Sequence, residues 1–78
     1  MGKNAEFSTH LTECKGMPII HLSGEIDLYT VPKFQQALRA GIDAGAPIII
    51  VDLTNVQYID SAGLSVIIAA YKELSSLK

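Results

Sequence analysis

Residues 48–64 read IIIVDLTNVQYIDSAGL, and this stretch decides how the chain folds. Residues 48–53 form a short, β-branched and largely apolar run, which predicts a parallel strand covered on both faces or by a neighbouring strand and a helix. Ser61 stands where a helix is expected to begin. A hydroxyl there lies beside unpaired backbone N–H groups and the positive end of the helix dipole, so it suits either a cap or a phosphate.

The residues before this stretch predict a hairpin and a helix. Residues 7–13 alternate with the period of a strand that has one wet face, and residues 17–23 return after a turn as the second strand. Thr30 is placed to cap a helix that holds Pro32 in its first turn and ends at Gly45. The apolar stripe of this helix consists of Val31, Phe34, Leu38 and Ile42. Because the helix joins two strands in a right-handed crossover, the fold class is α/β.

A second helix is expected over residues 61–77. Its core face consists of Leu64, Ile67, Ile68, Tyr71 and Leu74. Three more apolar residues lie off this stripe, namely Val66, Ala69 and Ala70. The helix is therefore apolar over more of its circumference than one sheet contact requires, and part of that surface is expected to meet something else.

Composition and charge favour a small domain that binds protein. With 78 residues, of which 49% are apolar, the chain is expected to form one domain over residues 1–78. The net charge is −2 and the six basic residues are scattered, so nucleic-acid binding is not expected. A lone Cys14 and an N-terminus without a signal-peptide run indicate the cytoplasm. Residues 66–71 are too short an apolar run to span a membrane.

Enzymatic chemistry is not expected from this chain. Residues 59–63 match only the second half of the Gly-x-Ser-x-Gly nucleophile elbow, and an isoleucine occupies the position that needs glycine. His10 and His21 lie in the predicted hairpin, where each is expected to be a strand residue. Because four residues of a straight strand span about 13 Å, His10 and Cys14 cannot share a metal ion. The sequence therefore predicts no catalytic residue, no metal site and no cofactor.

A family resemblance is carried by residues 52–64, read together with residues 22–28 and Thr30. They resemble the STAS domain family, and most of all its bacterial anti-sigma factor antagonists; the string Asp60-Ser61-Ala62-Gly63-Leu64 is the most specific part. The resemblance covers residues 7–77 and implies a small mixed sheet with helices packed against it. It implies that Ser61 is phosphorylated by a partner that is both serine kinase and anti-sigma factor, and that a phosphatase reverses this. When unphosphorylated, the chain would bind this partner and so release a sigma factor for transcription.

The segments after the second and third strands are expected to meet at one edge of the sheet, because the carboxyl ends of parallel neighbours lie together. The residues expected to bind the partner there are Asp27, Thr30, Asp60, Ser61, Ala62 and Gly63. Asp27 has a second interpretation as a structural turn residue, and either Asp60 or Ser61 can simply cap the helix. A phosphate on Ser61 is expected to leave the fold intact and to abolish partner binding.

The chain also departs from the family it resembles. The family's domain continues through another strand and helix, so we expect this chain to be truncated at its C-terminus or completed by another chain. An open apolar edge would then favour homodimers. The alternative function is a STAS module that serves as a scaffold or transport accessory with no phosphorylation cycle. Ser61 favours the switch, because an accessory module has no need of a hydroxyl there.

Overall fold

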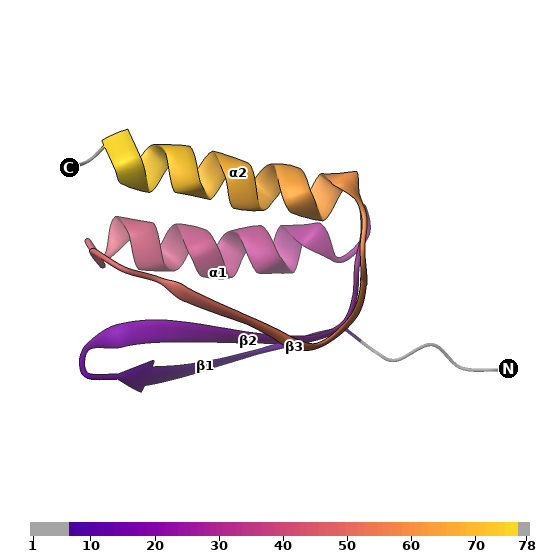
Figure 1. Cartoon of the computed structure of the whole chain (residues 1–78), viewed down its shortest axis with the longest axis horizontal. Coiled ribbons are helices and arrows are strands. Elements are labelled where there is room, and N and C mark those ends of the chain that lie inside the picture. The colour runs from indigo at the N-terminus through magenta and orange to yellow at the C-terminus, as the bar shows by residue number, and fades with distance from the viewer. Residues whose placement is uncertain (1–6, 77–78) are drawn as a thin grey trace, which may run out of the picture.

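A sheet and two helices form two layers in the computed structural model, which describes residues 7–76 (Figure 1). The elements are β1 (Ser8–Cys14), β2 (Met17–Ile26), α1 (Val31–Asp43), β3 (Ile50–Ile59) and α2 (Ser61–Ser76). The strand order is β1-β2-β3, with β1 antiparallel and β3 parallel to β2. Both helices lie on the same side of this sheet. The predicted α/β class, a small mixed sheet with helices packed against it, is confirmed.

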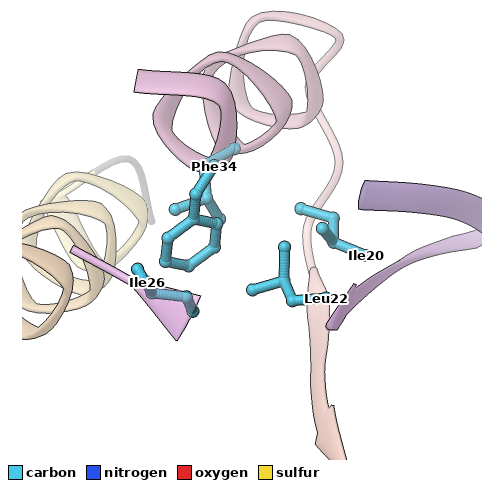
Figure 2. Packing of buried hydrophobic residues seen from close by; sticks show 5 residues of the cluster. Ile20, Leu22, Ile26 and Phe34 are labelled. Atoms are coloured by element: carbon cyan, nitrogen blue, oxygen red, sulfur yellow. The ribbon is translucent and has the colours of Figure 1, made fainter. Parts of the chain in front are cut away.

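The core lies between β2 and α1. Alternate residues of β2 turn toward the helices, and Ile20, Leu22 and Ile26 among them are buried. Figure 2 shows these three side chains gathered around the ring of Phe34, which comes from α1 and is fully buried. Burial of one such side chain contributes roughly 1.5–3 kcal/mol, so this cluster is a main reason that α1 packs here. The apolar stripe predicted for α1 is confirmed, since its buried residues are Phe34, Leu38 and Ile42.

The hairpin forms as predicted, but β1 is more exposed than expected. Lys15 and Gly16 form the loop between the paired residues Cys14 and Met17, with φ angles of 53° and 82°. Positive φ at both positions is what a two-residue type I′ turn needs. All of β1 is exposed, and Leu11 keeps 60% of its surface open. The prediction of a strand with only one wet face is therefore wrong, because the buried cluster is built from β2 and α1 and β1 lies to its side.

Both parallel strands are longer than the sequence predicts. β2 ends at Ile26 rather than at residue 23, and β3 covers Ile50–Ile59 rather than residues 48–53. The extension passes two irregularities in register, one of them directly after Gly24, whose φ of 90° favours glycine. Polar residues in the extension look like a loop in the sequence, but they fit a strand that has water on one side.

β3 is covered on one face and open at one edge. Within the described residues it is the last strand of the sheet, so one of its edges has no neighbour. Ile50 and Leu53 stay 37% and 40% exposed, although Val51 and Val56 pack against the core. Of the two kinds of cover that the sequence left open, the structure therefore shows the second, a neighbouring strand together with a helix, because β2 pairs with β3 and the helices lie on one side of the sheet only (Figure 1).

α1 ends where the sequence predicts. Gly45 follows the helix with a φ of 82°, a backbone conformation that glycine adopts without strain. Its N–H donates to the carbonyl of Ile42 at 3.0 Å, and the N–H of Ala46 donates to that of Gly41 at 3.2 Å. These two bonds form a Schellman motif, which satisfies carbonyls at the end of the helix.

The face that α2 turns to the core agrees only in part with the predicted one. Its inward residues are Gly63, which is buried, and Val66, Ile67 and Ala70, which pack against the core. Three residues of the predicted core face remain 50%, 53% and 71% exposed, namely Leu64, Ile68 and Tyr71. The predicted face is therefore right for Ile67, which packs inward, and for Leu74, which is half-buried, and wrong for the other three. The helix is rotated because α2 lies beside α1 as well as on the sheet, with Arg39 of α1 paired to Glu73 of α2. Leu77, the predicted helix end, lies outside the described residues.

A row of hydrogen bonds links the three strands through side chains. Thr12 Oγ1 lies 2.7 Å from His21 Nε2, and His21 Nδ1 lies 2.8 Å from Asp52 Oδ2. The N–H of Thr54 donates to Asp52 Oδ1 at 2.9 Å, and the Thr54 hydroxyl donates to the same oxygen. Hydrogen bonds from the Thr54 hydroxyl, the Thr54 N–H and His21 favour the carboxylate, so the pKa of Asp52 falls from 3.8 to about 2.

We expect this row to make the stability of the fold depend on pH in acid. The pKa of Asp52 is about 2 in the folded chain against an ordinary 3.8, so the contribution of the ionised carboxylate is present above pH 3.8 and is lost as the pH falls toward 2. In urea unfolding between about pH 5 and pH 2, Asp52→Asn should flatten this loss. Glu13→Gln on the exposed β1 is the control. If Asp52→Asn keeps the parent's pH slope, the assignment is wrong.

Candidate functional site

The two segments that carry the predicted site residues do meet at one edge of the sheet. β2 and β3 are parallel neighbours, and Ile26 pairs with Ile59 at their ends. The N–H of Asp60 donates to the carbonyl of Ile26 at 3.1 Å. Asp27 and Asp60 therefore leave the sheet side by side, and the turns into α1 and α2 lie at the same end of the molecule (Figure 1). The expectation of a shared carboxyl edge is confirmed.

The turn between β2 and α1 is held by two side chains. Asp27 Oδ1 accepts the N–H groups of Tyr29 and Thr30 at 2.9 and 3.1 Å. The Thr30 hydroxyl donates to the carbonyl of Glu25 at 2.8 Å and accepts the N–H of Asp27 at 2.9 Å. These bonds point back into the turn, so both side chains shape it.

Thr30 does not cap α1 through its hydroxyl, contrary to the prediction. It occupies the N-cap position but has φ −99° and ψ −20°, which are helical values, and makes no side-chain cap bond. A capping residue normally keeps an extended backbone, which turns its oxygen toward the first N–H groups of the helix. Here the hydroxyl is turned to Glu25 instead. Thr30 and Asp27 remain predicted partner contacts, with their side chains half-buried.

Asp60 caps α2 and leaves Ser61 available. Asp60 Oδ1 accepts the N–H groups of Ala62 and Gly63 at 2.9 and 3.3 Å, and its carbonyl accepts the N–H of Leu64 at 3.1 Å. Of the two capping residues that the sequence left open, the structure therefore selects Asp60. Ser61 is exposed at the first position of α2, and its hydroxyl makes no hydrogen bond to any residue in the described range 7–76. This oxygen is open to a reagent from solvent.

The last two predicted site residues lie deeper. Ala62 is half-buried and Gly63 is buried at the start of α2. A Cβ on Gly63 would lie 2.7 Å from Ile59 Cγ1 and 2.8 Å from Ile26 Cγ2. The missing side chain thus allows α2 to begin directly against the ends of β2 and β3. Gly63 is placed to set the position of Ser61, and contact between Gly63 and a partner stays a prediction.

Two residues at this edge were missed by the sequence analysis. Leu28 and Tyr29, at the tip of the turn before α1, are 67% and 88% exposed. Sequence periodicity could not identify them, because two apolar residues in the middle of a short turn follow neither the helical nor the strand period. The available signal was their position between Asp27 and Thr30, the residues that hold that turn.

Residues 7–76 contain neither a metal-binding cluster nor a membrane-spanning helix. No group of three or more His, Cys, Asp or Glu side chains in that range is arranged to hold a metal ion. No helix in the same range is long and apolar enough to cross a membrane. His21 lies in the row with Thr12 and Asp52, and the His10 ring centre lies 5.9 Å from that of His21, so both are strand residues as predicted.

Comparison with known proteins gives concordant matches. A model of the STAS domain family matches residues 9–78. The chain is 44% identical over 55 residues to an anti-sigma-B factor antagonist of Listeria monocytogenes, covering 70% of this chain and 48% of the relative. An anti-sigma factor antagonist from Mycobacterium paratuberculosis has a similar structure, with a TM-score of 0.81, 31% identity, and coverage of 86% of this chain and 57% of that one.

A Bacillus cell fate determinant in its phosphorylated form shares the fold, with a TM-score of 0.73 at 22% identity, over 90% of this chain and 65% of that one. The chain spans about half the length of the curated relatives it matches.

We expect Gly63→Ala to destabilise the fold. The new Cβ would press on Ile26 and Ile59 at the strand ends, and overpacking of this kind costs about 1–3 kcal/mol, more than the roughly 1 kcal/mol that alanine gains over glycine in a helix. Gly41→Ala is the matched control, because its Cβ would meet only the end of the Ile49 side chain, at 2.9 Å. Urea unfolding should show the larger loss for Gly63→Ala. Equal stability of the two variants would contradict the packing role of Gly63.

Proposed function

The chain belongs to the STAS domain family, and on that premise we propose that it is an anti-sigma factor antagonist switched by phosphorylation of Ser61. In this proposal the unphosphorylated chain binds an anti-sigma factor that is also a serine kinase, and a sigma factor is released for transcription. The names of the relatives from Listeria monocytogenes and Mycobacterium paratuberculosis support the antagonist role. A phosphatase acting on phosphorylated Ser61 would restore binding, and the cycle would take place in the cytoplasm.

One observation carries this proposal: the Ser61 hydroxyl is exposed at the start of α2 while Asp60 does the capping. A phosphate there adds about −1.5 to −2 charges at a helix N-terminus, where the dipole contributes roughly 0.3–1 kcal/mol of attraction per charge. Repulsion from the neighbouring Asp60 and Asp27 opposes this attraction. These local effects nearly cancel, and the Ser61 hydroxyl makes no hydrogen bond within residues 7–76. Phosphorylation should therefore leave the structure intact.

The same phosphate is expected to weaken partner binding much more than it affects the stability of the fold. If Asp27, Thr30, Asp60, Ala62 and Gly63 surround the contact together with Ser61, a dianion would have to be desolvated within it. Burying a charge without a partner costs several kcal/mol, which is much more than the local balance at the helix end. Loss of binding, and not unfolding, would therefore be the consequence of modification.

We also propose that the open edge of β3 allows two copies of the chain to associate. Among residues 7–76 no strand pairs with this edge, which also carries the partly exposed Ile50 and Leu53. The only charged residue in β3 is Asp52. Lysine on an edge strand opposes such pairing. Sedimentation velocity at rising concentration should therefore show a growing mass for the parent chain and a smaller rise for Ile50→Lys. Thr9→Lys, on the opposite edge strand β1, should behave as the parent. A parent chain that stays monomeric contradicts this proposal.

The switch is tested with ATP and the anti-sigma-B factor of Listeria monocytogenes. Intact mass and peptide mapping should find one phosphate on Ser61 in the parent and in the control Ser65→Ala, which lies one turn along α2, and none in Ser61→Ala. Ser61→Ala should still bind, whereas Ser61→Asp should bind at least tenfold more weakly with an unchanged circular dichroism spectrum.

Two outcomes would count against the switch. If Ser61→Asp unfolds or binds as tightly as the parent, charge at this position does not control binding. If the parent binds the anti-sigma factor but accepts no phosphate, a scaffold or transport accessory module without a phosphorylation cycle becomes the better description.

A further inference from the structure

Two large apolar side chains at the site edge are mostly exposed to solvent. Tyr29 is 88% exposed and Leu28 67% exposed. Tyr29 is the more exposed of the two and is the most open of the large apolar residues in the described range. Leaving such surface in water forgoes burial energy, which is roughly 25 cal/mol for each Å² of apolar area. The fold gains little burial from either side chain, which leaves their surface available to a partner.

The backbone beneath these side chains is held firmly. The N–H of Tyr29 is bonded to Asp27 Oδ1, and the carbonyl of Asp27 accepts the N–H of Val31 at 2.8 Å. The Thr30 hydroxyl donates to the carbonyl of Glu25, next to the last residue of β2, and so ties the turn to the strand. A turn that is ordered before binding loses little further conformational entropy when a partner covers it. The binding free energy from its side chains is therefore not reduced by a cost of ordering the backbone.

The polar residues around the turn have less to offer a partner. The Thr30 hydroxyl and Asp60 Oδ1 already bond groups of their own turns, and so does Asp27 Oδ1. By contrast, tyrosine is among the residue types that most often carry binding energy at protein interfaces, and such residues cluster near the centre of the contact. Carboxylates at this edge also make anionic lipid or nucleic acid an unfavourable partner. The fitting partner is a protein with an apolar pocket.

We propose that Leu28 and Tyr29 are the apolar anchors that bind the protein partner, while Asp27 and Thr30 act as positioning residues for the turn. The inference rests on the proposed function and extends it, because it separates affinity from switching. The bond between Asp60 and Ile26 keeps the anchor turn beside the start of α2. A phosphate on Ser61 therefore stands next to a contact that must exclude water, which is where a dianion is most costly.

The test is binding of the full chain to the anti-sigma-B factor of Listeria monocytogenes, measured by calorimetry. Tyr29→Ala should raise Kd at least about 30-fold, which corresponds to about 2 kcal/mol at 1.4 kcal/mol per tenfold change, and Leu28→Ala about tenfold. Tyr71→Ala is the matched control: Tyr71 is 71% exposed but lies ten residues beyond Ser61, about 15 Å along α2. It should bind within about twofold of the parent.

The outcomes separate this inference from the function on which it rests. If the parent chain does not bind the anti-sigma factor, the proposed function is wrong, and so is the proposed role of Leu28 and Tyr29. If the parent binds and both Leu28→Ala and Tyr29→Ala bind equally well, the inference alone is overturned. Tyr29→Phe should retain most of the affinity, since the ring supplies the buried area. Circular dichroism of each variant should match the parent, because neither side chain is buried in the fold.

Discussion

The parallel pairing of β2 with β3 is the contact on which the rest of this structure depends. It brings two carboxyl ends together, and the bond from the Asp60 N–H to the Ile26 carbonyl joins them at 3.1 Å. Both helices start from this edge and run back over the same side of the sheet (Figure 1). The pairing therefore adds Val51, Val56 and Ile59 to the side of the core that β2 and α1 form, and it places the two site turns next to each other.

At that edge, the residues that hold the backbone differ from those that face solvent. Asp27, Thr30 and Asp60 bond N–H or carbonyl groups of their own turns. The Ser61 hydroxyl and the side chains of Leu28 and Tyr29 face solvent instead. Under the proposed function this division has a physical use. A charge added at Ser61 changes what a partner meets without breaking any bond that keeps the turns in shape.

Sequence patterns predicted the buried residues correctly where an element has apolar residues on one side only. The stripe of α1 predicts its buried residues, because that helix has a single apolar side. The prediction was only partly right for α2, whose apolar residues cover most of its circumference and could face the sheet in more than one rotation. It failed for the ends of β2 and β3, because polar residues on the water-facing side of a sheet resemble those of a loop. The exposed Tyr29 carried no periodic signal at all.

The sequence by itself determined the order of the elements, the hairpin turn, the start of α2 at Ser61 and the STAS family, because each depends on local backbone preferences or on a short contiguous motif. Only the tertiary structure decided which face of α2 is inward, how far β3 extends, and that Asp60 caps while the Thr30 hydroxyl does not. These outcomes depend on contacts between residues far apart in the chain. A buried glycine at residue 63 against Ile26 and Ile59 is such a contact, and no local pattern encodes it.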